Sequence, residues 1–170
     1  TPEYALDPSN PANLNTVTLP DIRPDIRGDM APAYMEIRHN LHMDMREAID
    51  VVADIDKKFK KTFKRGGTPY LEPYRCEDAD FVAICLGSLS YQLRDVVDLL
   101  RDEGILVGVM GLRLYRPFPD QAIAEALAGR KCVIVFEKAL SYGNQGALYA
   151  DIKSALYPCK NRPRVHNYIL

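Results

Sequence analysis

Four short apolar runs in the second half of the chain constrain its fold more than any other feature. One segment with helical periodicity separates each run from the next, and the runs span residues 81–86, 106–112, 132–136 and 165–170. Strands this apolar are buried on both faces, which requires helices on both sides of the sheet and right-handed crossovers. The pattern therefore predicts a three-layer αβα domain with a mostly parallel sheet.

The ends of the predicted helices are marked by turn residues. The first helix lies between Ser88 and Gly104, the second spans residues 120–127, and the third spans 145–156 before Pro158. A short edge strand at 71–75 brings the sheet to five strands. The sequence thus predicts one α/β domain over residues 70–170, with the element order ββαβαβαβ.

Residues 33–67 predict a long amphipathic helix ahead of this domain. Neither Gly nor Pro occurs from residue 33 to 65, and apolar side chains recur every three or four residues until Gly66 and Gly67. At 1.5 Å per residue the helix is roughly 45 Å long, more than the domain needs to cover one face. Two interpretations stay open: it packs wholly on its own domain, or a partner domain or subunit covers its far end.

Residues 1–32 are rich in proline, with six of the chain's twelve. Each proline fixes φ and removes a backbone donor, so the segment is predicted to be extended and irregular. Apolar residues recur through it, which favours a strap or linker over a disordered tail. The chain starts at Thr1 and stops on an apolar, strand-like segment, so we expect a fragment of a longer protein.

Composition excludes several classes of partner. A formal charge of −1 gives no electrostatic reason to expect nucleic acid or an anionic membrane. No apolar run approaches the roughly 20 residues that a bilayer crossing needs, which predicts a soluble protein. Two of the four cysteines lie inside apolar strand-like runs, and this usage is typical of a reducing, cytoplasmic setting.

Two loops at the carboxyl ends of predicted strands are the candidate sites, because ligands of such sheets gather there. The first begins with Gly87-Ser88, a small-residue turn at a helix start whose backbone amides could hold an anion or a cofactor phosphate. It lacks the complete glycine-rich phosphate-binding patterns, so a tight connection with a capping serine is the favoured interpretation.

The second loop follows the strand at 132–136 and is the most site-like segment of the chain. Glu137 and Lys138 could form an acid/base pair, although adjacent opposite charges more often form an ordinary ion pair. The glycines of this loop allow close approach to another surface. Lys138, Tyr142, Gly143 and Asn144 lie in this loop, and the family resemblance described below implies that they form an interface.

Arg113 and Arg116 are further interface candidates. They bracket Tyr115 at the end of a predicted strand, where two guanidinium groups could grip a carboxylate, a phosphate or a neighbouring domain.

Catalytic and metal-binding patterns are not found. His39 and His42 lie one helical turn apart with Asp44 nearby, but exposure to solvent is the favoured interpretation over a metal face. The cysteines have no CxxC spacing, and the Gly-x-Ser-x-Gly order of serine hydrolases is absent. We predict no catalytic residue and no metal ligand in this chain.

Several segments resemble the α subunit of 2-oxoacid:ferredoxin oxidoreductases, with the pyruvate enzymes the most similar. The similarity covers roughly residues 32–170 and is carried by six segments in the family's order: 34–38, 81–90, 102–109, 112–119, 137–146 and 149–156. The matched part is similar to the second domain of that subunit, which has the fold of the C-terminal domain of transketolase. The resemblance therefore implies the same α/β fold as the pattern of strands and helices.

The resemblance implies an enzyme that oxidatively decarboxylates pyruvate to acetyl-CoA and passes electrons to ferredoxin. It implies thiamine diphosphate, magnesium, iron–sulfur clusters and CoA, held mainly by other domains and subunits. The GDG motif that binds thiamine diphosphate and the cluster-ligating cysteines are missing here. We therefore expect a scaffold that contacts neighbouring domains and subunits and is inactive alone. An independent anion- or nucleotide-binding domain, a branched-chain 2-oxoacid homologue and a pure interaction module are the alternatives.

Overall fold

The computed structural model describes residues 30–170, with side chains from residue 38 onward. Apart from residues 30–32, the predicted strap lies outside this part. The chain divides between Ala48 and Ile49 into two compact units. Among the described helices, none combines the length and apolarity that a bilayer crossing needs.

Helix α3 spans Met30–Phe63 and corresponds to the predicted long amphipathic helix. It begins ahead of Pro32, which the first helical turn tolerates because its N–H groups have no partner inside the helix. It ends where Lys64 adopts a left-handed backbone with φ 55°. The boundary in α3 between the two units means that the helix belongs to both.

The α/β domain has the predicted order of elements. Its strands are β1 (Leu71–Tyr74), β2 (Phe81–Leu86), β3 (Val107–Leu112), β4 (Cys132–Glu137) and β5 (Arg164–Ile169). The helices α4 (Leu89–Asp102), α5 (Asp120–Leu127) and α6 (Ala147–Leu156) alternate with β2 to β5. The predicted boundaries agree with these within about two residues.

The five strands form one sheet in the order β1-β3-β2-β4-β5. The strands β2 to β5 are parallel, whereas β1 pairs antiparallel with β3, with Leu71 opposite Leu112. Pro73 lies in β1, and an edge strand can accommodate a residue without an N–H. The prediction of a mostly parallel, five-stranded α/β fold is therefore confirmed.

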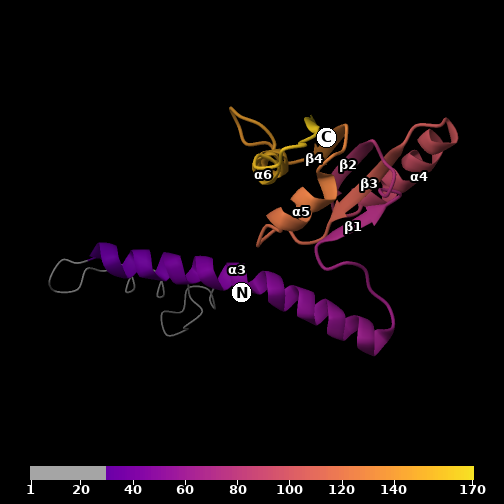
Figure 1. Cartoon of the computed structure of the whole chain (residues 1–170). Coiled ribbons are helices and arrows are strands. Elements are labelled where there is room, and N and C mark those ends of the chain that lie inside the picture. The colour runs from indigo at the N-terminus through magenta and orange to yellow at the C-terminus, as the bar shows by residue number, and fades with distance from the viewer. Residues whose placement is uncertain (1–29) are drawn as a thin grey trace, which may run out of the picture. The chain divides into compact units, whose positions relative to one another are not determined.

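Helices cover both faces of the sheet (Figure 1). On one face, Val82 and Ile84 of β2 share a buried cluster with Ile123 of α5 and Ile152 of α6. On the other face, strands β2 and β3 pack against Val97 of α4. The neighbouring Val96 is 46% exposed because the helical step of 100° carries it to the edge of the buried face.

Candidate functional site

The strand order reverses between β2 and β4, and a cavity lies at their carboxyl ends. The chain leaves β2 for β3 on one side and then crosses to β4 on the other, so the segments after β2 and β4 diverge. A cavity of about 500 Å³ lies here and is lined by Gly87, Ser88, Gln92, Tyr115, Glu137 and Lys138, among others. The structure therefore brings both predicted loops to one site.

The turn after β2 is built differently from the prediction. Gly87 has a left-handed backbone with φ 66°, and Ser88 stands at the N-cap position of α4. The side chain of Ser88 makes no capping hydrogen bond, so the predicted cap is wrong. Instead the hydroxyl of Ser90 donates to the carbonyl of Gly87 at 2.8 Å. Ser88 already has helical φ and ψ, whereas a capping side chain needs an extended backbone.

Glu137 closes the start of α6 and makes neither the acid/base pair nor the ion pair considered from the sequence. Its side chain is only 6% exposed. The backbone N–H groups of Leu148 and Tyr149 donate to its two carboxylate oxygens at 2.8 and 3.0 Å. The amide of Asn167 on β5 donates to Oε1 at 2.9 Å. Glu137 therefore holds α6, β4 and β5 together and has no free oxygen for catalysis.

Gly146 is required by this arrangement. Its φ of −61° suits any residue, but a Cβ at this position would overlap the carboxylate of Glu137 and the side-chain oxygen of Asn167. The N–H of Gly146 donates to that same oxygen at 3.1 Å. The sequence carried one signal of this network: α6 begins with Gly and Ala, so its first N–H groups need acceptors from elsewhere.

Arg113 and Arg116 make contacts inside the described part of the chain. The guanidinium of Arg113 donates to the carbonyl of Thr68 at 2.6 Å. Arg116 donates to the carboxylate of Asp151 at 2.7 Å and lies over the ring of Tyr115 at 4.1 Å. Burial, together with Asp151, raises the pKa of Tyr115, so its hydroxyl stays protonated at neutral pH. Both arginines remain about half exposed.

The loop between β4 and α6 projects into solvent. Tyr142 is 95% exposed and Leu140 is 45% exposed. Hydrogen bonds within the loop link Ser141 to Gln145 and Asn144 to Ser141, and Gly143 has φ 78°. Lys138 and Asn144 are exposed as well. The loop is thus shaped by its own hydrogen bonds and presents an aromatic ring that the described residues leave uncovered.

The cavity at the strand ends has little catalytic chemistry. Its lining contains neither His nor Cys, and the carboxylate of Glu137 accepts three hydrogen bonds from the protein. The amine of Lys138 and the first amides of α4 are the groups that could receive an anion. These groups suit the site to binding an anion.

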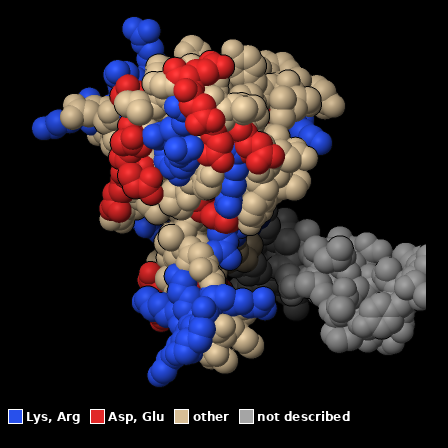
Figure 2. All heavy atoms as spheres, turned by 90° about the vertical axis from the view of Figure 1, so that its right-hand side faces the viewer, with Lys and Arg blue, Asp and Glu red and all other residues tan. Residues whose placement is uncertain are grey.

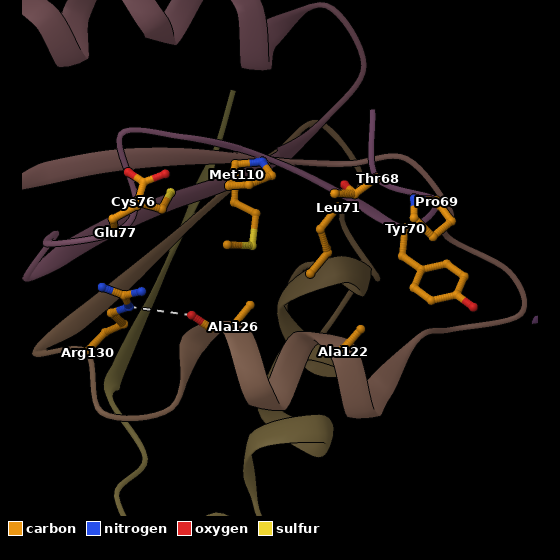
Figure 3. A pocket seen from close by; sticks show the side chains of 11 residues that line it. Thr68, Pro69, Tyr70, Leu71, Cys76, Glu77, Met110, Ala122, Ala126 and Arg130 are labelled. Atoms are coloured by element: carbon orange, nitrogen blue, oxygen red, sulfur yellow. Dashed lines mark hydrogen bonds between the residues drawn. The ribbon is translucent and has the colours of Figure 1, made fainter. Parts of the chain in front are cut away.

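A second cavity, of about 360 Å³, lies between β1 and α5 and had no sequence signal (Figure 3). Leu71 and Met110 point from the sheet toward Ala122 and Ala126 of α5. Arg130 lies at one end, where its guanidinium donates to the carbonyls of Ala79 and Ala126. The small side chains of α5 leave the space open, and its lining suits an apolar group.

The comparisons with known proteins agree with this fold. A family model described as "Pyruvate:ferredoxin oxidoreductase core domain II" matches residues 79–170, more than half of the chain. The chain belongs to this family.

Curated relatives of this domain II chain extend the similarity upstream of residue 79. It is 39% identical over 141 residues to pyruvate synthase subunit PorA of Thermotoga maritima and 34% identical over 157 residues to PorA of Methanothermobacter thermautotrophicus. It is also 35% identical over 172 aligned positions to ketoisovalerate oxidoreductase subunit VorA of Pyrococcus horikoshii. The recognition of an α subunit of the 2-oxoacid:ferredoxin oxidoreductases is therefore confirmed.

The matched segments cover 83, 91 and 99% of this chain but only 36, 37 and 44% of the three relatives. The domain II chain therefore spans less than half the length of the curated relatives that it matches.

The described residues of this domain II chain do not fit a metal ion or an iron–sulfur cluster. No three His, Cys, Asp or Glu side chains gather as a ligand set in residues 38–170, and His39 and His42 are exposed. All four cysteines are free, and Cys76 and Cys85 are buried. Burial raises the pKa of Cys85 to about 11, so its sulfur stays protonated at neutral pH.

Proposed function

We propose that this chain is the assembly portion of the α subunit of a pyruvate:ferredoxin oxidoreductase. The parent enzyme oxidatively decarboxylates pyruvate to acetyl-CoA and passes electrons to ferredoxin in the cytoplasm. Thiamine diphosphate, magnesium, iron–sulfur clusters and CoA belong to other domains and subunits. Within the chain, α3 (Met30–Phe63) and the residues ahead of it connect the α/β domain at 70–170 to the rest of the subunit.

The exposed ring of Tyr142 is the observation that carries the assembly role. A tyrosine that is 95% exposed, on a loop held by its own hydrogen bonds, contributes contact area to a partner with little further ordering. Lys138, Gly143 and Asn144 surround it, and Arg113 and Arg116 are the remaining interface residues. The partners are neighbouring domains and subunits of the complex.

The test is made in the complete enzyme, with Tyr142→Ala in the α subunit. We expect incomplete assembly, measured by native mass spectrometry, with unchanged activity for each assembled complex. Tyr157→Ala is the matched control, since Tyr157 is 76% exposed but lies outside the loop. Normal assembly of the Tyr142 variant would contradict the assembly role.

The 170-residue chain alone, given pyruvate, thiamine diphosphate and CoA, is expected to reduce no dye. Dye reduction would overturn the non-catalytic assignment.

Pyruvate is the proposed substrate, in preference to a branched-chain 2-oxoacid. The family description names pyruvate, as do two of the three relatives above, whereas the third is a ketoisovalerate oxidoreductase subunit. Comparing kcat/KM of the complete enzyme for pyruvate and 2-ketoisovalerate distinguishes the two. A higher value for 2-ketoisovalerate would assign the branched-chain homologue.

Anion or nucleotide binding at the strand ends is the second candidate function. It is favoured by the cavity of about 500 Å³, which has Lys138 in its lining. Thermal unfolding of the chain with inorganic phosphate, pyrophosphate and ATP tests it, since a ligand of the folded state raises Tm. A rise that Lys138→Ala removes and Lys160→Ala retains would support binding. No rise at millimolar concentration would eliminate it.

A further inference from the structure

Helix α3 carries an apolar stripe with the spacing of a two-stranded coiled coil. The steps along it alternate between four and three residues: Leu41, Met45, Ala48, Val52, Ile55 and Phe59. This repeat keeps the apolar side chains on one side of the helix, where they pack against a second helix.

Four of the six residues of the stripe are exposed, and Ala48 and Val52 are half-buried. The exposed fractions are 52% for Leu41, 57% for Ile55 and 39% for Phe59, and no side chain of α3 from residue 38 onward is buried. Phe63, whose ring centroid lies 4.6 Å from that of Phe59, is 56% exposed. Long helices in proteins gain most of their stability by packing an apolar face, and contiguous exposed apolar surface marks an interaction site.

Charges along α3 are separated into an acidic and a basic segment. Residues 44–56 contain five acidic residues and one arginine, and residues 57–65 contain six basic residues and no acidic one. The basic segment forms a dense patch at the bottom of Figure 2. Two of its lysines pair with aspartates of the same helix: Lys57 with Asp54 at 3.0 Å and Lys60 with Asp56 at 2.6 Å. A helix dipole of about half a charge does not need six cations, so dipole compensation alone does not explain the patch.

We propose that α3 pairs antiparallel with α3 of a second copy of this chain. An antiparallel pair lays the basic segment of each helix beside the acidic segment of the other, and a two-fold axis produces both contacts from one sequence. A parallel pair would instead set like charges side by side, which is unfavourable. The pairing depends on α3 alone and stands whether or not Tyr142 forms an interface.

The apolar stripe fixes the register of the pair. When Val52 lies beside Ile55 of the second copy, Ala48 lies beside its Phe59, so the smallest side chain of the stripe faces the largest. The same register sets Glu47 opposite Lys60 and Lys61 of the second copy. Apolar packing and charge complementarity thus select one arrangement.

The first test measures the oligomeric state of the 170-residue chain by sedimentation velocity. We expect a dimer at micromolar concentration in low salt, with a Kd that rises about tenfold or more between 50 and 500 mM NaCl as the charges are screened. A chain that stays monomeric at 100 µM in low salt would overturn the proposal.

The second test determines orientation by zero-length carbodiimide cross-linking of a mixture of ¹⁴N- and ¹⁵N-labelled chains. Glu47 and Lys61 are about 21 Å apart within one helix at 1.5 Å per residue, too far for a direct amide bond. A mixed-isotope product joining these residues therefore requires antiparallel pairing. Mixed products that join α3 only to the α/β domain would contradict it.

Charge-reversal variants provide the third test. The triple variant Lys58→Glu/Lys61→Glu/Lys64→Glu is expected to weaken dimerisation about tenfold or more, and mixing it with Asp44→Lys/Glu47→Lys/Asp50→Lys restores a heterodimer. The control Lys131→Glu/Lys153→Glu/Lys160→Glu has the same change in charge away from α3 and leaves Kd unchanged. Circular dichroism verifies that each variant keeps its helices.

The alternative occupant of this face is another polypeptide of the enzyme. If the chain is monomeric but binds the remaining subunits, and the α3 triple variant abolishes that binding while the control does not, the face belongs to that polypeptide. That outcome would refute pairing between copies.

Discussion

Glu137 caps the start of α6, because the helix has no capping side chain of its own. It is buried, and two backbone N–H groups and the Asn167 amide donate hydrogen bonds to its carboxylate. Removing an acceptor from buried donors costs the desolvation of each donor in addition to the bond itself. The local consequence is that β4, α6 and β5 share one polar contact.

Glu137→Ala is expected to lower the free energy of unfolding by about 3 kcal/mol, because it leaves buried N–H groups without an acceptor. Glu137→Gln keeps the shape but replaces one acceptor oxygen with a donor, and should cost about 1–2 kcal/mol. Urea unfolding measures both. Glu103→Gln, at an exposed position, is the matched control and should change stability by less than about 0.5 kcal/mol. Equal effects of the Glu137 and Glu103 substitutions would contradict the capping role.

Because the thiol of Cys85 is buried, we expect the domain to lose stability in alkaline solution. Burial raises the pKa of this thiol from 9.0 to about 11, so the folded state prefers the protonated form. The contribution of the Cys85 thiol to the free energy of unfolding is therefore complete below pH 9. It is lost as the pH rises from 9 to 11, because the thiol of the unfolded chain ionises first. The loss is about 2–3 kcal/mol.

Urea unfolding at pH 7.5, 9 and 10.5 measures this loss. Cys85→Ala should show a shallower decline than the wild type, whereas Cys159→Ala, at a partly exposed cysteine, should decline like the wild type. The same slope in all three proteins would show that other groups cause the alkaline loss.

For single residues, the sequence predicted where the site loops lie but not which hydrogen bonds their side chains make. Both loops were located, because small and polar residues follow apolar strands there. The partners of Glu137 were not located, since they lie 11 and 30 positions away and sequence periodicity contains no information on long-range pairing.

Among the elements, α4 is fixed to the sheet by polar contacts at both ends. Arg94 donates to Glu72 of β1 at 2.7 Å near the start of the helix, and this bond lowers the pKa of Glu72. At the other end the Arg101 guanidinium donates to both carboxylate oxygens of Asp78, and also to the carbonyls of Arg75 and Val107. The planar guanidinium of arginine can donate to all of these oxygens at once, whereas the ammonium of lysine cannot.

Arg101→Ala is therefore expected to destabilise the domain by about 2–3 kcal/mol, and Arg101→Lys by nearly as much although it keeps the charge. Thermal and urea unfolding measure both effects. Arg162→Ala is the control, since that exposed side chain makes a single bond to the carbonyl of Tyr157. A lysine variant as stable as the wild type would show that charge alone, rather than the planar guanidinium, holds α4.

The elements themselves were predictable because apolar runs of strand length alternate with helical periodicity from residue 81 onward. The arrangement of these strands and helices in space was harder to predict. The antiparallel pairing of β1 with β3 and the cavity between β1 and α5 depend on strand order, which composition and period do not specify.

For the molecule as a whole, the buried core belongs to the α/β domain alone. Every buried apolar side chain in residues 38–170 lies between Leu71 and Pro163, and α3 contributes none. Two polar contacts join the Ile49–Phe63 part of α3 to the domain: Tyr70 donates to the carbonyl of Ile49 at 3.0 Å, and Arg113 lies 4.0 Å from Asp56. A single hydrogen bond and an ion pair as long as 4.0 Å contribute little to stability.

A chain shortened to residues 66–170 is therefore expected to fold on its own. Its unfolding free energy should lie within about 1 kcal/mol of that of the 170-residue chain, because α3 contributes no fully buried apolar side chain. Urea unfolding followed by tyrosine fluorescence measures this free energy, with far-UV circular dichroism to account for the missing helix.

A second shortened chain, residues 77–170, is the control. It also removes β1, including buried Leu71, and should lose several kcal/mol, because the β3 edge and the apolar surface beneath β1 become exposed. Equal stability of the two shortened chains, or failure of the first to fold, would show that α3 rather than β1 completes the domain.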